Sequence, residues 1–566
     1  MRAGFPLRPF SALSGVRAHA RPTPAKLLQT CQRGRWNSSN ASGASESKGQ
    51  FWTTSRALAL AAVVGSGAFA AAYQRGPSPA TVAAAIAELR ADLGEDAIST
   101  DDDDLHEHGY SEWSTVNADR LPVAIAYPKT TEEVSKIAQV CYKYRMPMVP
   151  YAAGSSLEAN FSAPFGGMTI DFAFMDRVLE LHKDDMDVVV QPSIQWMQLN
   201  NEIASSGLFF PVDPGPSAKI GGMVGTNCSG TNAVRYGTMK DWVINLTVVL
   251  ADGRVIKTRR RPRKTSAGYN LTGMFVGSEG TLGIVTEVTL KLAPIPDLMR
   301  VGVATFPTVR DAAAAAMQVI HRSVPVQAVE IMDEIQMNVI NRAGGTGRTW
   351  KEEPTLFFKF SGTTAQVADS IQVTKNIAQS NKSTSFEFAK DEHEAHSLWS
   401  ARKQSLWAFL ALREGEGDVW STDVSVPLSR LPDLIEISKK ELRELGTVAS
   451  IIGHIGDGNF HSSILYNRKN REETERVEKV VHDMVDRAIE MEGSCTGEHG
   501  VGLGKKEFLV KELGPDTIDI MRSVKRALDP HWLMNPGKIF DYSEDIHVTN
   551  AADFESARQF GAKKHK

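Results

Sequence analysis

Three stretches rich in glycine and other small residues lie close together in the middle of the chain. They read Ala152-Ala-Gly-Ser-Ser156, Asp213-Pro-Gly-Pro-Ser-Ala-Lys-Ile-Gly-Gly-Met-Val-Gly-Thr-Asn-Cys-Ser-Gly230 and Gly277-Ser-Glu-Gly-Thr-Leu-Gly-Ile284. Small residues let backbone N–H groups approach an anion closely. One such stretch alone is more often an ordinary loop, but three in succession are more than turns require. Together they predict a cradle for a long ligand such as a dinucleotide, with its pyrophosphate held by main-chain donors.

The residues around these stretches have an α/β pattern. Residues 123–127 and 148–151 are apolar and short enough for strands, and residues 285–292 alternate as a strand does. Thr130 followed by acidic residues is a helix-start signal for the helical spacing at 134–144. No G-x-G-x-x-G stands at a strand-to-helix junction, and no G-x-x-x-x-G-K-[ST] occurs. A nicotinamide-binding Rossmann domain and a P-loop are therefore unsupported.

The segment Gly453-His-Ile-Gly-Asp-Gly-Asn-Phe-His461 predicts a β-hairpin. Asp457-Gly458 is a strong two-residue turn signal between the apolar runs 448–455 and 460–466. With the turn centred there, His454 lies directly opposite His461. Opposed residues share a sheet face, with Cβ atoms roughly 4.5–5.5 Å apart. Two imidazoles at that separation can bind one divalent metal ion; ordinary surface or core histidines are the alternative.

A second segment, Cys495-Thr-Gly-Glu-His-Gly500, adds a carboxylate beside another histidine. A His, His, Glu ligand set leaves a coordination position open for a substrate, as catalytic metal sites do. The four cysteines (Cys31, Cys141, Cys228 and Cys495) form no C-x-x-C pair, which argues against a disulfide framework, a zinc ribbon and an iron–sulfur cluster.

Composition places the chain among globular proteins. Its 566 residues suffice for about three domains, 42% are hydrophobic and 23% are charged. The formal net charge of −4 gives no reason to expect nucleic acid binding.

The N-terminal region has the composition of a targeting segment. Residues 1–45 hold seven Lys or Arg and no Asp or Glu, which is typical of a mitochondrial transit peptide, with a disordered basic tail as the alternative. Residues 57–74 are uncharged and rich in alanine, and we interpret them as a single inner-membrane anchor. A buried or linker helix is the rival interpretation. The acidic run Asp101–Asp104 is interpreted as a solvated linker.

Several segments of the chain, taken together, resemble those of a known family. The segments P-Y-A-A-G-S-S-L-E, D-P-G-P-S-A-K-I-G-G-M-V-G-T-N-C-S-G and G-S-E-G-T-L-G-I-V-T-E resemble the FAD domain of the vanillyl-alcohol-oxidase-type flavoproteins. The segments G-H-I-G-D-G-N-F-H, C-T-G-E-H-G-V-G and M-N-P-G-K resemble the D-2-hydroxy-acid dehydrogenase branch of that family, and most of all its mitochondrial, cytochrome-linked D-lactate dehydrogenases. The resemblance runs from about residue 115 to residue 540.

The resemblance implies an α+β fold with a two-subdomain FAD-binding domain of the vanillyl-alcohol-oxidase type and an α+β cap domain with an antiparallel sheet. The implied boundaries are 1–45 for the transit peptide and 46–114 for the anchor and acidic linker. The FAD-binding domain would span 115–295 and the cap domain with the metal site 296–525. A C-terminal return to the FAD domain would span 526–545, and a tail 546–566.

The resemblance also implies which residues contact FAD. The first small-residue stretch holds no histidine for a covalent link, so FAD is expected to bind non-covalently. The expected contact residues are Pro150, Tyr151, Ala152, Ala153, Gly154, Ser155, Ser156, Pro214, Gly221, Gly222, Thr226, Asn227, Ser229, Gly230, Glu279, Gly280, Ile284 and Asn535.

The implied reaction is oxidation of D-lactate to pyruvate, with a hydride passed to flavin N5 and electrons passed on to cytochrome c. His454, His461 and Glu498 would bind Zn²⁺ or another divalent metal ion. His499 would be the base, because adjacent residues in an extended segment point to opposite sides. Arg402, in a W-x-x-R element, would bind the substrate carboxylate.

Alternatives remain open from the sequence. Relatives that oxidise D-2-hydroxyglutarate carry Thr and Lys where this chain has Leu406 and, less securely aligned, Ser421, which favours a small monocarboxylate. Transfer of electrons to O₂ or a quinone is not excluded. A zinc metallohydrolase would leave the small-residue stretches unexplained, and a membrane-tethered binding protein would keep the fold without the activity. The expected location is the inner mitochondrial membrane, facing the intermembrane space.

Overall fold

The computed structural model describes residues 77–344, 348–413 and 417–542. The expected transit peptide (1–45), membrane anchor (about 57–74) and tail (546–566) fall outside these residues. No helix within the described ranges combines the length and the apolar character needed to cross a bilayer.

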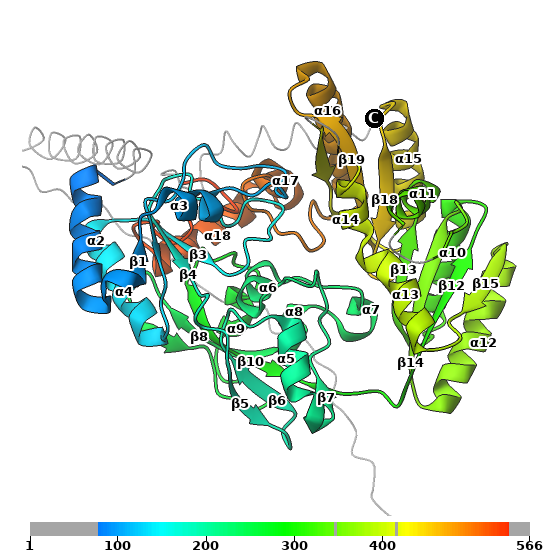
Figure 1. Ribbon diagram of the computed structural model, residues 1–566, viewed down its shortest axis with the longest axis horizontal. Helices are drawn as coiled ribbons and strands as arrows, with labels where there is room; N and C mark the ends of the chain where they lie inside the picture. Colours follow the sequence, from blue (N-terminus) through cyan, green and yellow to red (C-terminus); the bar gives the residue numbers. More distant parts are fainter. Residues whose placement is uncertain (1–76, 345–347, 414–416, 543–566) are drawn as a thin grey trace, which may run out of the picture. The chain divides into compact units, whose positions relative to one another are not determined.

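The FAD-binding half begins before residue 115, within the stretch expected to be a linker, with a small mixed sheet covered by helices (Figure 1). Its elements are α2 (Pro79–Leu93), η1 (Glu95–Ala97), β1 (Ile98–Ser99), α3 (Asp102–Gly109), β2 (Ala124–Ala126), α4 (Thr131–Tyr144), β3 (Met148–Tyr151) and β4 (Met168–Asp171). The strand order is β1-β2-β4-β3, in which β2, β4 and β3 run parallel and β1 antiparallel. Helices α2 and α4 pack against each other, and their apolar faces share one core with these strands.

Local signals predicted these elements well. The hydroxyl of Thr130 accepts a hydrogen bond from the Glu133 N–H at 3.2 Å, so this threonine caps α4 as the helix-start signal indicated. The strand expected at 148–151 is β3, and the strand expected at 123–127 is β2. The first small-residue stretch therefore follows directly after the C-terminal end of β3, a parallel strand.

The second subdomain is built on an antiparallel sheet with the order β5-β6-β10-β8-β9. Its elements are β5 (Val178–His182), β6 (Asp187–Val190), α5 (Trp196–Ile203), η2 (Ala204–Ser206), β7 (Leu208–Phe209), α6 (Ile220–Thr226), α7 (Ala233–Tyr236), α8 (Met239–Trp242), β8 (Val243–Val249), β9 (Val255–Lys257), α9 (Leu271–Phe275), β10 (Ile284–Lys291) and β11 (Ala293–Pro294). The second small-residue stretch contains α6, and the third ends where β10 begins.

The cap is one antiparallel sheet with the order β15-β12-β14-β13-β18-β19-β16, and β17 pairs with β19. Its elements are β12 (Leu298–Thr305), α10 (Val309–His321), β13 (Val326–Met332), α11 (Glu334–Ala343), β14 (Thr355–Gly362), α12 (Thr364–Ser380), β15 (Ser385–Phe388), α13 (Glu392–Lys403), α14 (Ser405–Leu410), β16 (Gly417–Ser421), β17 (Val424–Ser425), α15 (Leu431–Glu444), β18 (Ala449–Gly453), β19 (Asn459–Asn467) and α16 (Arg471–Glu490).

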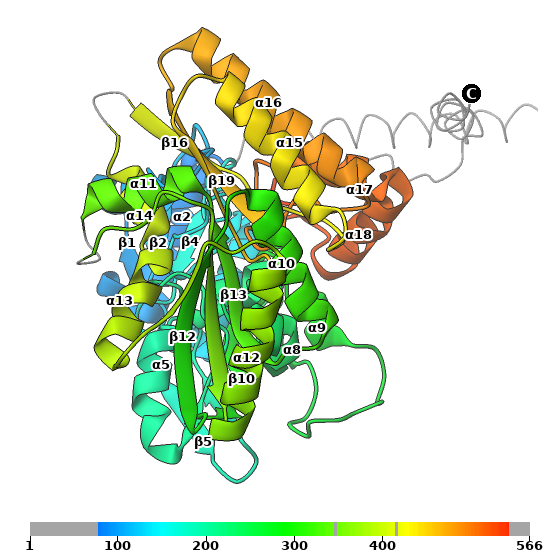
Figure 2. The ribbon, with the colours of Figure 1, turned by 90° about the vertical axis from the view of Figure 1, so that its right-hand side faces the viewer.

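Both faces of the cap sheet are buried. On β14, Phe358 and Phe360 join the core formed with α10, α12, α15 and α16, which lie in front of the sheet in Figure 2. Phe357, the residue directly before Phe358, joins the core formed with α11, α13 and α14. This alternation is the period of two expected of a strand. It directs the residues of one face toward α13, the helix that carries Arg402.

The predicted register of the His454–His461 hairpin is wrong. Residue Ile452, not His454, pairs with His461, and His454 begins the connection between β18 and β19. The Asp457 N–H donates to the His454 carbonyl at 2.9 Å, so the turn is centred on Ile455 and Gly456. Tertiary packing explains the shift: a Cβ on Gly456 would come within 2.7 Å of atoms of Val234 and of Val329.

The C-terminal segment runs back along the first sheet. Helices α17 (Lys506–Leu513) and α18 (Pro515–Leu528) precede it. Met534 forms a parallel bridge with Met148 of β3, and the Asn535 N–H donates to the Met148 carbonyl at 2.7 Å. Two packed α+β units result, and Asn535 lies where the first small-residue stretch begins.

Candidate active site

A cavity of about 390 Å³ is lined by residues of both halves. Its walls on the FAD-binding side come from all three small-residue stretches, and its walls on the cap side come from α13, α14 and the sheet. The cap-side residues are Arg402, Lys403, Ser405, Leu406, Ser421, Ile452, His454, His461 and Ser463, and the loop before α17 adds Glu498 and His499. Stretches far apart in the sequence thus converge on one space.

Most of the residues expected to contact FAD line this cavity. They are Pro150, Tyr151, Ala152, Ala153, Gly154, Ser155, Ser156, Pro214, Gly221, Gly222, Thr226, Gly230, Glu279, Gly280 and Asn535. Three expected residues do not line it. The side chain of Asn227 accepts hydrogen bonds from Thr238 and Lys240, Ser229 donates to Glu498 at 2.5 Å, and Ile284 is fully buried in a core.

The glycines of the second stretch keep the cavity open, which suits a large ligand. A Cβ on Gly222 would meet only the Ala152 Cβ, at 3.9 Å, so a side chain there would project into the space. A Cβ on Gly230 would come within 2.5 Å of the Asp213 carbonyl carbon, so this glycine permits a close approach of two backbone segments. The cradle therefore suits FAD by its small residues and by its mixed apolar and main-chain lining.

Glu279 and Asn535 hold the walls of the cradle together. The carboxylate of Glu279 accepts hydrogen bonds from the N–H groups of Val501 and Gly502, at 2.7 and 2.8 Å, and from the Asn160 amide. The Asn535 amide donates to the Glu279 carbonyl at 2.7 Å and to the Asn160 carbonyl at 3.0 Å. Burial raises the pKa of Glu279, and the hydrogen bonds that its carboxylate accepts from Val501, Gly502 and Asn160 oppose the rise. The third stretch, the C-terminal segment and the loop that carries Glu498 are thereby fixed to one another.

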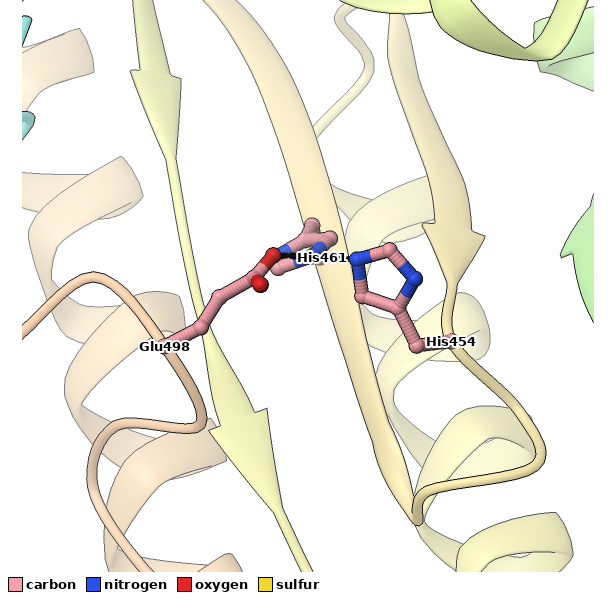
Figure 3. Close-up of side chains that lie close together, drawn as sticks. All are labelled: His454, His461 and Glu498. Carbon is pink, nitrogen blue, oxygen red and sulfur yellow. Dashed lines mark hydrogen bonds and ion pairs between the residues drawn. The ribbon is translucent and has the colours of Figure 1, made fainter. Parts of the chain in front are cut away.

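His454, His461 and Glu498 converge as the sequence predicts, although the hairpin register differs (Figure 3). The Nε2 atoms of His454 and His461 lie 3.0 and 3.3 Å from the same Glu498 oxygen. Ligand atoms at about 2.0–2.2 Å from a tetrahedral metal stand roughly 3.3 Å apart. The two histidines reach one point because β18 and β19 are paired, and because His454 follows Ile452 by two residues and points to the same side.

The hydrogen bonds of the outer ring nitrogens favour a cation between these three side chains. The Nδ1 of His454 donates to Glu330 at 2.8 Å, and the Nδ1 of His461 donates to the Thr422 carbonyl at 3.2 Å. Each Nε2 therefore turns a lone pair toward a carboxylate, which is repulsive unless a proton or a metal ion lies between them. Burial opposes charge on His454, but Glu330 and Glu498 outweigh burial and raise its pKa well above the usual value. The three side chains fit a divalent metal ion.

His499 lies on the cavity wall with a neutral imidazole. Its ring stacks on the His461 ring, with centroids 4.9 Å apart and planes 7° from parallel. Burial lowers the pKa of His499 to about 4. Within the described residues its buried Nδ1 has no hydrogen-bond partner. A neutral imidazole beside the cation site is able to accept a proton.

Asp423 organises the loop that carries Glu498 and His499, and the sequence interpretation missed it. One carboxylate oxygen accepts hydrogen bonds from the N–H groups of Gly497, Glu498 and His499, at 2.6, 2.7 and 3.0 Å, and from the Thr496 hydroxyl at 2.9 Å. Burial alone would raise the pKa of Asp423, but neighbouring basic groups hold it below the usual value, and of these Lys505 is a permanent cation. The sequence signal was a single acid within an otherwise uncharged run, 419–429.

Arg402 reaches the cavity from the end of α13, and Glu330 holds it there. The Nε and Nη2 of Arg402 lie 2.9 and 2.7 Å from one Glu330 oxygen, and both residues are buried. Glu330 is the second residue that the sequence interpretation missed; its signal was an acid in the apolar strand at 326–332. Trp407 follows the cavity residue Leu406 in α14 but does not itself line the cavity. It is half exposed and packs against Trp113, at a ring-centroid distance of 4.9 Å.

Comparisons with known proteins agree with this architecture. Residues 122–259 match the family model described as FAD binding domain, and residues 295–539 match the model described as FAD linked oxidases, C-terminal domain. A solved structure, the 4-ethylphenol oxidase of Gulosibacter chungangensis, covers 84% of this chain and 100% of its own, with a TM-score of 0.70 at 18% identity. This likeness confirms the expected fold.

Curated relatives share a larger fraction of identical residues with this chain than that solved structure does. The mitochondrial D-lactate dehydrogenase [cytochrome] of Arabidopsis thaliana is 46% identical over 80% of this chain and 79% of its own. The protein of the same name from Kluyveromyces lactis is 43% identical over 82% of this chain and 83% of its own. The chain therefore belongs to the family of FAD-linked oxidases that includes the mitochondrial, cytochrome-linked D-lactate dehydrogenases.

Proposed function

We propose that this protein oxidises D-lactate to pyruvate with non-covalent FAD and passes the electrons to cytochrome c. The observation that carries the proposal is the single cavity in which the small-residue stretches meet Arg402, His499 and the three candidate metal ligands. Relatives more than 40% identical over most of the chain have the name D-lactate dehydrogenase [cytochrome]. The proposal explains why a cation site and a neutral base lie in the wall of a dinucleotide-sized cradle.

Two bound groups would supply chemistry that side chains do not. FAD, held by the cradle residues named above, would accept the two electrons that leave the substrate. A divalent metal ion, Zn²⁺ being our candidate, would be held by His454, His461 and Glu498 and would act as a Lewis acid on the substrate oxygens.

The chain's own residues bind and deprotonate the substrate. Arg402 binds the carboxylate of the 2-hydroxy acid, because its guanidinium is a permanent cation on the cavity wall. His499 accepts the hydroxyl proton at a ring nitrogen, since its lowered pKa keeps the imidazole neutral near pH 7. Arg402 is buried and His499 is partly buried, which limits the access of water to the reacting groups and strengthens their electrostatic interactions.

The cap-side wall favours a small monocarboxylate over D-2-hydroxyglutarate. Leu406 and Ile452 are apolar, and Ser421 and Ser463 are uncharged. The second cation on this wall, Lys403, lies 3.5 Å from Asp213 and over the Trp196 ring, so its charge is already countered. A second carboxylate on the substrate would therefore lack a free cationic partner among these residues.

For location we propose the mitochondrial inner membrane, with the enzyme facing the intermembrane space. The composition of residues 1–45 and the names of the relatives support the mitochondrion. The alanine-rich residues 57–74 are our candidate for the anchor. Carbonate extraction of mitochondria that express the full chain, compared with a chain lacking 57–74, tests the anchor: release of both proteins alike would refute it.

Turnover with defined partners tests the function. Purified protein should show flavin absorbance and should reduce cytochrome c with D-lactate far faster than with L-lactate or D-2-hydroxyglutarate. Faster turnover of D-2-hydroxyglutarate would transfer the proposal to that substrate. Protein without flavin absorbance that instead hydrolyses esters or amides would favour the zinc metallohydrolase.

A further inference from the structure

Glu330 is a buried carboxylate shared by two residues of the candidate active site. It lies in β13, is 1% exposed and does not line the cavity, whereas His454 and Arg402 both do. One of its oxygens accepts from the His454 Nδ1 at 2.8 Å. The other accepts from the Nε and Nη2 of Arg402, at 2.9 and 2.7 Å. A single side chain behind the wall thus contacts both a candidate metal ligand and the candidate carboxylate-binding residue.

The bond to His454 sets the direction of that ring's lone pair. Glu330 only accepts hydrogen bonds, so it holds a proton of His454 at Nδ1 and leaves Nε2, on the side of Glu498, as the nitrogen that would bind a metal ion. Such an outer partner orients a metal-binding imidazole and raises its basicity, and its loss typically weakens metal binding about 10–100-fold.

The bonds to Arg402 decide which edge of the guanidinium faces the substrate. Because Glu330 takes the Nε–Nη2 edge, the N–H groups of Nη1 and the second N–H of Nη2 remain for another carboxylate. Asp213, which lines the same cavity, lies 3.5 Å from Lys403 and accepts hydrogen bonds from Thr231 and Asn232. The free edge of Arg402 is therefore aimed by Glu330.

We infer that Glu330 is a positioning residue that couples metal binding to binding of the substrate carboxylate. The inference rests on the proposed function for the identity of the substrate. A shift of the Glu330 carboxylate toward His454 also shifts its bonds to Arg402, and the reverse holds. Binding of the metal ion should therefore change the affinity for the substrate carboxylate, and the substrate should change the affinity for the metal ion by the same factor. A buried ion pair that served stability alone would not change either affinity.

The test compares Glu330→Gln with Asp333→Asn. Glutamine keeps the size of Glu330, but its amide NH₂ must face either the His454 N–H or the Arg402 N–H groups, where only acceptors fit. Asp333 is an equally buried carboxylate three residues away. Its side chain pairs with Lys439 at 2.9 Å and accepts from the Gln336 N–H, and neither of these described partners lines the cavity. Asparagine at 333 still caps α11, so this variant controls for loss of a buried ion pair.

Three measurements distinguish the outcomes: FAD content, Zn²⁺ affinity by competition with a chromophoric chelator, and KM and kcat for D-lactate. We expect Glu330→Gln to keep FAD, to bind Zn²⁺ about 10–100-fold more weakly and to raise KM more than it lowers kcat. Asp333→Asn should lower the melting temperature and leave Zn²⁺ affinity and KM as they were. Glu330→Asp, which keeps the charge on a shorter side chain, should fall between the wild type and Glu330→Gln.

The inference and the proposed function fail separately. If the wild type binds Zn²⁺ but does not oxidise D-lactate, the function is wrong, and the Zn²⁺ affinity of Glu330→Gln still decides the role of Glu330. If Glu330→Gln melts earlier but binds Zn²⁺ as the wild type does, with an unchanged KM, Glu330 is only structural. Should Glu330→Gln not fold, the same two readouts on Glu330→Asp decide, since wild-type affinity and KM in that variant would refute the inference.

Discussion

Replacement of Asp423 by asparagine should loosen the loop that carries Glu498 and His499. The Asp423 carboxylate accepts three backbone N–H groups of this loop on one oxygen. Asparagine keeps the shape and one acceptor oxygen, so the hydrogen bonds become neutral instead of charge-assisted. A bond to a charged group contributes about 1.5–3 kcal/mol and a neutral bond about 0.5–1.5 kcal/mol. At about 1 kcal/mol lost for each of the three bonds, the loop is destabilised by about 3 kcal/mol.

This magnitude has two measurable consequences. Hydrogen exchange of the Gly497, Glu498 and His499 amides should accelerate about 100-fold, because each 1.4 kcal/mol changes an opening equilibrium about tenfold. If the loop opens only with the whole cap, the melting temperature should fall by about 6–12 °C for a domain of this size. The kcat for D-lactate should also fall, by up to about 100-fold, because small displacements of reacting groups are costly.

Asp418→Asn is the matched control. Asp418 lies five residues earlier, in β16, and forms a partly exposed ion pair with Arg468 at 2.8 Å. Such pairs contribute about 0–1 kcal/mol, so this variant should leave the exchange of amides 497–499 unchanged. If Asp423→Asn leaves exchange at those three amides at the wild-type rate, Asp423 does not organise the loop and the reasoning is refuted.

Further predictions concern the ligands, the base and two packing sites. His454→Ala should lose the metal ion by elemental analysis and keep FAD; unchanged metal content would refute the ligand set. His499→Ala should lower kcat about 10²–10⁴-fold with FAD and metal retained, and parental turnover would remove it as the base. Burial lowers the pKa of Lys359 to about 8 from 10.5. Between these values the unfolded chain binds a proton that the folded chain does not, so wild-type stability should rise with pH there. At pH 7 the free energy of unfolding of Lys359→Met should therefore exceed that of the wild type by about 3 kcal/mol, with the gap closing toward pH 10. Gly502→Ala should fold poorly, because its Cβ would lie 1.9 Å from the Glu158 carbonyl oxygen; a normal melting curve would contradict this.

The sequence predicts elements well where the deciding interactions are local. Thr130 and the helical spacing behind it located α4, and the apolar run at 148–151 located β3, because capping and periodicity act within a few residues. The turn of the hairpin was misplaced for the opposite reason. Asp457-Gly458 is a strong local turn signal, but Val234 and Val329 pack against Gly456. In addition, the Val426 N–H donates a hydrogen bond to the Gly458 carbonyl at 2.9 Å.

The candidate site was predicted in part. His454, His461 and Glu498 carry recognisable motifs, and their convergence survives the register error because His454 still points to the side of His461. Glu330 and Asp423 have no motif of their own. Glu330 depends on Arg402 and His454, which lie 72 and 124 residues away in the sequence. Asp423 depends on the loop that carries His499, more than 70 residues away. Contacts between such distant residues become visible only when the sheet is assembled.

Anaerobic mixing of the purified, FAD-loaded and metal-loaded protein with lactate, followed by flavin absorbance in a stopped-flow instrument, tests the central claim most directly. We expect rapid bleaching by D-lactate and none by L-lactate, with the D-lactate reaction slowed in His499→Ala. A flavin that stays oxidised in D-lactate, or that is bleached equally by both enantiomers, would contradict the central claim.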